Sequence, residues 1–286
     1  MPDKESWSSR PPRVDDCVLT FPSPHILLVT INRPRQMNTI PYLLHWQLDA
    51  LWSWFDAEPS LRCAIVTGAG TKSFCAGSDL LEIDEVNIAK QSGIASKEPW
   101  KHSHPKSGFA GLSRREGRKP IIAAVNGFAL GGGMEIVLNC DMVIASPTSS
   151  FGLPEAHRGL YASGGGLPRL LRTVGLPVAS DMALTGRRFS ASEALSYSLI
   201  NRISRSPESL LDEALEVAKS IAAISPDAII VTRAALREAW ETASVERAFQ
   251  LTHERYDEKL MKGFNAREGL AAFKEKRSPK WQASKL

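Results

Sequence analysis

Two short stretches of the sequence each place a carboxylate beside small residues, an arrangement suited to acid–base chemistry. In NGFALGGGMEIVLNCD, at 126–141, a glycine run precedes Glu135 at the start of an apolar segment. In FGLPE, at 151–155, Glu155 follows a proline in an apolar and glycine context. Glycines allow backbone amides to approach a ligand closely, and amides at a helix N-terminus favour negative charge. Carboxylates beside such amides could move protons next to a stabilised oxyanion.

Each of these residues also has a purely structural explanation. A carboxylate in the first turn of a helix, such as Glu135, stabilises the helix by about 0.3–1 kcal/mol without doing chemistry. Glu155 can be a solvated loop acid, and a glycine run can serve a tight turn or close packing. A second stretch of small residues, FCAGSDL at 74–80, favours the chemical explanation because it follows a strand and a turn. Amides from two such loops would form an oxyanion hole, where one donor lowers a barrier by about 3–4 kcal/mol.

Other motifs do not support a different chemistry. Gly68-Ala69-Gly70 follows a strand, but Ser73 occupies the third glycine position of a dinucleotide-binding fingerprint and no helix opens there. Ser163 precedes three glycines, yet no histidine is evident as its base. His102 and His104 have no acidic or cysteine partner nearby in the sequence. We therefore expect these histidines to be solvated, and we expect no metal site.

The composition is that of an ordinary globular protein. The 286 residues are 43% hydrophobic and 23% charged, with a net charge of +4, which is weak evidence for nucleic-acid binding. No apolar run reaches the roughly 18 residues of a membrane span, so no membrane association is expected. The four cysteines (Cys17, Cys63, Cys75 and Cys140) lie far apart without a CxxC pair, which predicts free thiols, mostly buried.

The elements that must position the candidate residues follow from hydrophobic patterns. Short apolar runs predict strands, and apolar residues at helical spacing predict helices. The predicted strands are His25–Ile31, Arg62–Thr67, Ile121–Val125 and Asp141–Ala145. The predicted helices are Tyr42–Phe55, Met134–Asn139, Pro207–Ile224, Pro226–Ala243, Val245–Lys262 and Ala266–Lys276. Strands that alternate with helices indicate an α/β core of parallel type, followed by a helical part.

These patterns divide the chain into three parts. Residues 1–24 are expected to form a flexible N-terminal arm, 25–205 the α/β core, and 206–286 a helical C-terminal region. Within the core, Ile83–Arg118 has the least regular pattern, and we expect a long, partly mobile loop there. Long loops in compact domains tend to be lids or binding loops, so this one is expected to shape a pocket.

Taken together, the motifs resemble those of the crotonase family, the enoyl-CoA hydratase/isomerase superfamily. The resemblance begins at NRPRQMN (32–38) and covers nearly the whole chain after residue 25. The other matching stretches are IVTGAG (65–70), SFCAGSDL (73–80), KPIIAAVNGFALGGGMEIVLNCDMVIA (119–145), FGLPEAHRGL (151–160), LTGRRFSASEAL (184–195) and AFKEKR (272–277). Several long motifs in the family's order make the resemblance specific.

The resemblance implies a fold, an assembly and a role for each site residue. It implies an α/β, crotonase-type spiral of ββα units with a helical C-terminal region, assembled as a homotrimer or a dimer of trimers. The backbone N–H groups of Ser78 and Gly132 would form the oxyanion hole for a thioester carbonyl. Glu135 would mainly handle the water, and Glu155 would mainly handle the proton at C2. Coenzyme A would enter as part of the substrate, with no permanently bound cofactor.

The resemblance also implies contacts to the CoA portion of the substrate. Family members often have a CoA-contacting lysine three residues after the position of Ser78, but this chain has Leu81 there. Ser163 likewise stands where family hydratases have a glycine whose amide helps to position the water. This substitution leaves open how efficiently the chain would catalyse hydration and which acyl group it would prefer. The residues expected to bind the substrate or CoA are Arg33, Arg35, Met37, Ala76, Asp79, Leu80, Lys276 and Arg277.

The paired glutamates favour one activity over its relatives. Retention of both acids, 20 residues apart, favours a hydratase/dehydratase that adds water reversibly to a 2-enoyl-CoA. The alternatives within the family are a double-bond isomerase or a specialised hydratase of secondary metabolism, acting on a siderophore or toxin acyl group. A non-catalytic assembly or RNA-binding module is a further alternative, but it does not require the glutamates or both oxyanion segments.

The last three residues match a targeting signal. The peroxisomal import receptor reads the tripeptide Ser284-Lys285-Leu286 when it stands at a C-terminus. The preceding segment KEKRSPKWQA is polar and basic, which suits an accessible tail. We therefore expect a peroxisomal location and the import receptor as a partner.

Overall fold

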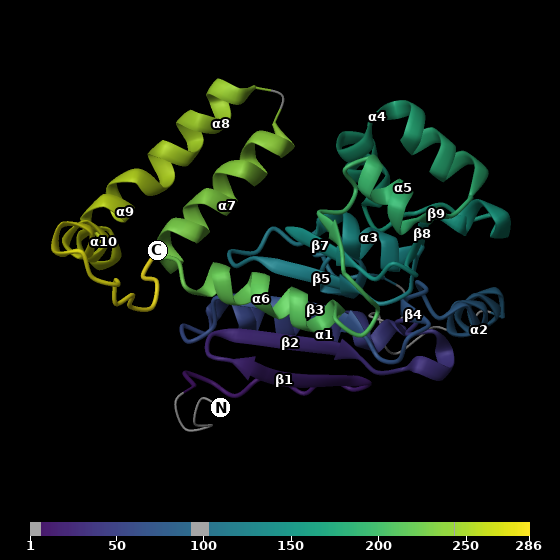
Figure 1. Ribbon diagram of the computed structural model, residues 1–286. Helices are drawn as coiled ribbons and strands as arrows, with labels where there is room; N and C mark the ends of the chain where they lie inside the picture. The colour runs from purple at the N-terminus through teal and green to yellow at the C-terminus, as the bar shows by residue number, and fades with distance from the viewer. Residues whose placement is uncertain (1–6, 93–102, 243) are drawn as a thin grey trace.

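The computed structural model describes residues 7–92, 103–242 and 244–286 and contains two β-sheets (Figure 1). Six strands form the first sheet in the order β1 (Cys17–Ser23), β2 (Ile26–Ile31), β3 (Cys63–Gly68), β5 (Ile121–Val125), β7 (Met142–Ala145) and β10 (Arg202–Ile203). Four shorter strands form the second sheet in the order β4 (Ser73–Cys75), β6 (Phe128–Leu130), β8 (Ser150–Gly152) and β9 (Phe189–Ser190).

The chain winds between these sheets as a spiral. Strands β3 and β4, β5 and β6, and β7 and β8 are consecutive pairs in which the first strand joins the large sheet and the second joins the small one. Within the large sheet, β2, β3, β5, β7 and β10 run parallel to one another. Helix α2 (Leu80–Gln91) follows the first pair, and α3 (Gly132–Asn139) follows the second. This arrangement confirms the expected α/β spiral of ββα units.

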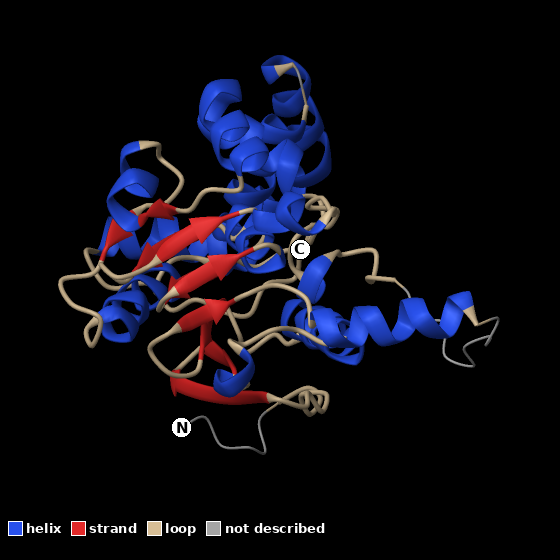
Figure 2. Cartoon of the chain, turned by 90° about the vertical axis from the view of Figure 1, so that its right-hand side faces the viewer, coloured by secondary structure: helices blue, strands red, loops and turns tan. Residues whose placement is uncertain are grey.

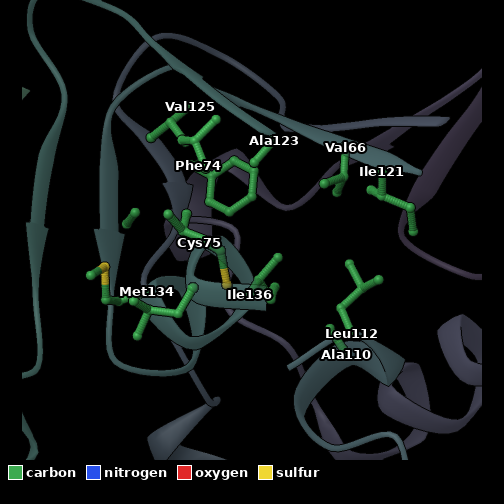
Figure 3. Close-up of a cluster of buried hydrophobic side chains, with 14 of the residues drawn as sticks. Val66, Phe74, Cys75, Ala110, Leu112, Ile121, Ala123, Val125, Met134 and Ile136 are labelled. Carbon is green, nitrogen blue, oxygen red and sulfur yellow. The ribbon is translucent and has the colours of Figure 1, made fainter. Parts of the chain in front are cut away.

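The strand residues separate the core into two layers, as a period of two requires. On β5, Ile121, Ala123 and Val125 face the main core between the sheets, together with residues of β4 and α3 (Figure 3). The alternating residues Ile122 and Ala124 face the opposite side, where helix α6 (Leu210–Ala222) covers the large sheet. The near-continuous burial of these strands is typical of parallel sheets covered on both faces.

Further helices complete the core. Helix α1 (Tyr42–Ala57) packs against the 3-10 turn η3 (Phe109–Gly111), and α4 (Gly166–Thr185) packs against α3. Shorter elements are η1 (Pro34–Gln36), η4 (Pro154–Arg158) and α5 (Ala191–Ser196). Figure 2 shows strands of the sheets stacked in the interior with helices around them. Among the described residues, no helix combines the length and apolar character that a membrane span requires.

The C-terminal region is helical, as predicted. It consists of α7 (Pro226–Glu241), α8 (Val245–Thr252), the π-helical turn η5 (His253–Asp257), α9 (Glu258–Lys262) and α10 (Phe264–Glu275). Helices α7 and α8 form a hairpin, and α10 lies at the end of the molecule opposite α2 (Figure 1). The buried Asp141 carboxylate accepts hydrogen bonds from Arg233 and Arg237, which joins α7 to the core.

Two expectations about irregular segments are wrong. Residues 1–24 are not a loose arm throughout, because Cys17–Ser23 pairs with β2 as an antiparallel edge strand. Pro22 lies at the irregularity of the ladder between Thr20 and Ser23, and proline is tolerated at such a position of an edge strand. Ile83–Arg118 is not a loop throughout either, because Leu80–Gln91 is helical. Residues 93–102 lie outside the described chain.

Candidate active site

The glycine run forms the N-terminus of α3. Gly131, with φ of 56°, precedes the helix and donates its N–H to the carbonyl of Gly152, 3.0 Å away. A Cβ on Gly132 would lie 2.4 Å from the Phe109 ring, and one on Gly133 would lie 2.0 Å from the carbonyl oxygen of Cys75. Neither position has room for a side chain. Within the described residues, no hydrogen bond uses the N–H of Gly132.

The second amide donor comes from the turn after β4. Ile40 donates its N–H to the Gly77 carbonyl at 2.9 Å, and its own carbonyl accepts from Asp79 at 3.3 Å. This bridge leaves the N–H of Ser78 without a partner among the described residues. A Cβ on Gly77, where φ is +94°, would lie 3.3 Å from the nitrogen of Gly132. The structure therefore brings the two predicted oxyanion segments into contact.

Glu135 lies in the first turn of α3 and is only 3% exposed. Its carboxylate accepts a hydrogen bond from the N–H of Gly166 at 2.8 Å. The pKa of Glu135 is raised to about 7. Burial is the main cause and the charge of Glu155 adds to it, while the backbone amides of Gly166 and Gly164 and the charge of Arg169 oppose the rise. A carboxyl group with this pKa exchanges protons near neutral pH, as general acid–base catalysis requires.

Glu155 lies in η4 and faces the same glycine run. Its Oε1 is 3.2 Å from the position that a Cβ on Gly131 would occupy, and its Oε2 is buried without a partner among the described residues. Burial raises the pKa of Glu155 as well, while its own backbone amide and Arg158 lower it. Burial is the largest cause of the raised pKa of both carboxyl groups, and the charge of Glu155 is a smaller cause for Glu135.

Sequence reasoning missed the residues that hold these groups in place. The Gly166 amide, the Phe109 ring and the Ser113 hydroxyl all surround the site, and none belongs to a motif that marks a catalytic role. Ser163, which stands at the substituted glycine position, is exposed and precedes the buried Gly164 beside Glu135. The substitution therefore leaves the neighbouring backbone packed against the carboxylate.

The predicted CoA-binding residues are brought together only in part. Arg33 bonds to the Asp79 carboxylate at 3.0 Å and to the Thr39 carbonyl at 2.8 Å. These contacts fix the loop before α2 and occupy the guanidinium group. Arg35 is exposed, and no ion pair within the described residues uses it. It is therefore the better placed of the two arginines to contact a phosphate.

The remaining predicted contacts lie at both ends of the molecule. Met37 accepts a backbone hydrogen bond from Ala76 at 3.1 Å, and Leu80 begins α2 with 43% exposure, so these three residues flank Ser78. Lys276 and Arg277 follow α10, at the end of the molecule opposite α2 (Figure 1). A single chain therefore does not bring this pair to the glutamates.

The predicted solvated histidine pair and the thiols have defined surroundings where the structure describes them. The His104 ring is half-buried and packs edge-on against His45 and Phe109, so it is not solvated, whereas His102 lies outside the described residues. All four cysteines are free. In the described chain, no group of three or more acidic, histidine or cysteine side chains could hold a metal ion.

A model of the family described as enoyl-CoA hydratase/isomerase matches residues 23–284. The chain belongs to this family. It is 48% identical to a mevalonyl-coenzyme A hydratase of Beauveria bassiana, over 98% of this chain and 100% of the relative. It is 47% identical to a mevalonyl-coenzyme A hydratase of Aspergillus fumigatus, over 96% and 98%. A crystal structure of a probable enoyl-CoA hydratase/isomerase from Mycobacterium abscessus superposes with a TM-score of 0.79 and 39% identity, covering 95% and 100% of the chains.

Family membership and the geometry agree on the type of reaction. This family member is a hydro-lyase that acts on acyl-CoA thioesters, and its fold is the crotonase spiral. Among the described residues, the amides of Gly132 and Ser78 have no hydrogen-bond partner, Glu155 lies against Gly131, and the buried Glu135 lies against Gly164 and Gly166. These groups provide what reversible addition of water to a conjugated thioester requires.

Proposed function

We propose that this hydratase interconverts mevalonyl-CoA and the 2-enoyl-CoA that mevalonyl-CoA forms by losing water across C2 and C3. The observation that supports a hydratase is that Glu135 lies in the first turn of the helix that begins at Gly132, while Glu155 lies against Gly131 of the same glycine run. The names of the two fungal relatives, which match almost the whole chain, support the acyl group. This proposal corresponds to the specialised acyl group that the sequence left open.

The reaction follows from the positions of the four groups. During hydration, Glu135 takes a proton from water as the oxygen bonds to C3, and Glu155 gives a proton to C2. The negative charge that develops on the thioester oxygen is stabilised by the N–H groups of Ser78 and Gly132. Dehydration runs the same steps in reverse. The two glutamates therefore hold one proton between them before and after the reaction. Hydration moves this proton from Glu155 to Glu135, and dehydration moves it back.

A substrate panel tests the proposed function. The purified protein is incubated with mevalonyl-CoA, 3-hydroxybutyryl-CoA and crotonyl-CoA, and gain or loss of water is followed by mass spectrometry. We expect turnover of mevalonyl-CoA with a higher kcat/KM than that of the linear thioesters. Faster turnover of crotonyl-CoA than of mevalonyl-CoA contradicts the acyl group, and no turnover of any thioester contradicts the hydratase.

We propose further that the protein assembles as a homotrimer or a dimer of trimers. Several apolar side chains on the C-terminal helices are exposed in the single chain, which favours a partner surface: Leu236, Val245, Phe249, Met261, Leu270 and Phe273. Assembly would also bring Lys276 and Arg277 of one copy towards a CoA bound to another. Contact between this pair and CoA is part of the same proposal.

A peroxisomal location is likewise proposed from the tripeptide Ser284-Lys285-Leu286. In the structure, Ser284 Oγ accepts a hydrogen bond from the N–H of Leu286, whose carbonyl accepts one from Arg118. A fluorescent protein fused to the N-terminus should appear in puncta that contain a peroxisomal marker. Deletion of the tripeptide should make the signal diffuse, and puncta that persist after the deletion contradict the proposal.

A further inference from the structure

Ser113 is a fully buried serine whose hydroxyl makes two hydrogen bonds near the active site. Its Oγ accepts the N–H of Phe109 at 2.7 Å and donates to the carbonyl of Gly164 at 2.6 Å. Gly108, with φ of +81°, makes room for this contact, because a Cβ there would lie 2.3 Å from the Ser113 oxygen. One hydroxyl therefore connects the segment around Phe109 to the segment around Gly164, although Ser113 and Gly164 are 51 residues apart in the chain.

The first segment supports the oxyanion hole. The buried Phe109 ring packs directly on Gly132, at 2.4–2.5 Å from the position that a Cβ would occupy there. The His45 ring packs edge-on against Phe109, and His45 Nδ1 accepts the N–H of Ala110 at 2.9 Å. Displacement of the Phe109 backbone would therefore loosen the surface against which the Gly132 amide rests.

The second segment supports the acid–base pair. A Cβ on Gly164 would lie 2.5 Å from Glu135 Oε2, the N–H of Gly166 donates to Glu135 Oε1 at 2.8 Å, and the Gly164 backbone helps to lower the pKa of Glu135. Ser113 donates to the Gly164 carbonyl and therefore fixes the backbone segment Gly164–Gly166 that lies against Glu135. The other charged groups that face Glu135 are Glu155 and Arg169.

We infer that Ser113 is a positioning residue that couples the oxyanion hole to the acid–base pair through Phe109 and Gly164. This inference rests on the proposed hydratase chemistry and goes beyond it by assigning a role to a residue that touches neither water nor thioester. A displacement of about 1 Å in a catalytic group can cost about 100-fold in rate. Loss of the Ser113 hydroxyl should therefore reduce kcat while leaving substrate binding largely intact.

The test compares Ser113→Ala, Ser113→Thr and Ser204→Ala with the wild-type protein, on the thioester that the wild type turns over best. Ser204 is a matched control because it is also buried and donates to a backbone carbonyl, that of Ser206, at 2.7 Å. We expect Ser113→Ala to lower kcat about 10- to 100-fold with KM nearly unchanged. Ser113→Thr should recover most of this loss because it keeps the hydroxyl, and Ser204→Ala should keep wild-type kcat.

Two further readouts separate positioning from general destabilisation. The alkaline limb of the kcat–pH profile should move to higher pH in Ser113→Ala, because a displaced Gly164–Gly166 backbone stabilises the Glu135 carboxylate less and so raises its pKa. The red shift in absorbance of a bound conjugated dienoyl-CoA, which reports polarisation of the carbonyl, should shrink. If Ser113→Ala does not fold, Ser113→Cys carries the same measurements, because a thiol is a weaker hydrogen-bonding group of similar shape.

The outcomes distinguish this inference from the proposed function. Absence of turnover by the wild type on every thioester contradicts the hydratase itself. Wild-type turnover together with unchanged kcat, pH profile and dienoyl spectrum in a folded Ser113→Ala overturns the role of Ser113 alone. An equal loss of kcat in Ser204→Ala, or no recovery in Ser113→Thr, overturns it as well, because the effect would then be one of general packing.

Discussion

Glu135 and Glu155 occupy different surroundings, although both face the glycine run. Glu135 is held by the Gly166 amide inside the core, whereas one oxygen of Glu155 has no partner within the described residues. A carboxyl oxygen without a hydrogen-bond partner is suited to exchanging a proton with a substrate carbon. An anchored carboxylate is suited to orienting a water molecule. The surroundings thus support the division of labour proposed for the pair.

Removal of either acid should therefore impair the reaction in both directions. We expect Glu135→Gln and Glu155→Gln each to lower kcat about 10²–10⁴-fold, because glutamine keeps the shape but cannot exchange the proton. The loss of enoyl-thioester absorbance during hydration measures the rate, and thermal unfolding checks that each variant is folded. Wild-type rates in both variants would contradict the acid–base assignment.

The pH dependence should report the pair as a unit. The reaction needs one proton shared between Glu135 and Glu155, so kcat should fall at both low and high pH. The raised pKa of Glu135, about 7, places the loss of the shared proton near neutral pH rather than near the usual range of a glutamate. Measurement of kcat from pH 5 to pH 9 tests this. A flat profile across neutral pH would show that the pair does not titrate as described.

The sequence predicted the reacting residues but not their supports. The candidate reacting residues belong to short motifs that can be recognised in the sequence: Ser78, Gly132, Glu135 and Glu155. Ser113 acts through contacts with residues up to 51 positions away, and no local pattern marks such a contact. The protonation of Glu135 was also beyond the sequence, because it depends on burial by distant elements.

At the scale of elements, the central strands β2, β3, β5 and β7 and the C-terminal helices were predicted well because their apolar patterns are clear, whereas the short strands of the second sheet were not predicted. Helix α4 was missed, although it is the longest of the described helices. Pro177 and Gly175 inside it argue against a helix, and Gly175 indeed has φ of 76°, which divides the element at a kink. Helix α2 was taken for a loop because its sequence, LLEIDEVNIAKQ, has little apolar periodicity. Helix α4 packs against α3, and such tertiary contacts stabilise a helix whose local signals are weak.

The attachment of α7 to the core depends on a buried ion pair. Asp141 accepts hydrogen bonds from Arg233 at 2.9 Å, from Arg237 at 2.9 Å and from the N–H of Ile121 at 2.9 Å. Asp141→Asn removes the charge and leaves the buried guanidinium group of Arg233 and the partly buried one of Arg237 without their carboxylate partner. We expect the free energy of unfolding to fall by about 3–5 kcal/mol, measured by urea denaturation near pH 7.

Two controls accompany the measurement on Asp141→Asn: a matched substitution in a surface ion pair, and the pH dependence of the free energy of unfolding. Glu258→Gln removes a charge from the exposed pair with Lys262 and should cost no more than about 1 kcal/mol. Burial would raise the pKa of Asp141, but Arg233 and Arg237 outweigh it, and the net pKa is lowered. The stabilisation is therefore present above the ordinary aspartate pKa and is lost as the pH falls through the lowered value. Equal stability of Asp141→Asn and wild type at neutral pH would refute the role of this ion pair.

At the scale of the whole molecule, the single chain leaves an unusual amount of apolar surface on its last helices. Phe273 is 85% exposed and Leu270 is 67% exposed, both on α10, far from the glutamates. Surfaces of this kind mark contacts with other protein chains. The same helix ends at Lys276 and Arg277, so assembly and CoA binding are expected to depend on one element.

Disruption of this surface should therefore dissociate the assembly. Phe273→Glu places a charge where an apolar contact is expected, and the mass measured by light scattering should fall from that of a trimer or hexamer towards one chain. KM for the acyl-CoA should rise in parallel, because the basic pair after α10 moves away from the neighbouring site. Leu184→Glu, which changes a leucine on α4 that is 80% exposed, controls for the added charge. An unchanged mass for Phe273→Glu would exclude α10 from the interface.

The use of main-chain N–H groups as oxyanion donors has a consequence for engineering this protein. No ordinary substitution at position 78 deletes the donor, because only proline lacks the N–H. The Ser78 side chain is half-buried, and none of the described hydrogen bonds needs it. A library of side chains at position 78 can therefore change the shape of the site for new thioesters, while each variant except proline keeps the backbone N–H that is proposed to bind the thioester oxygen.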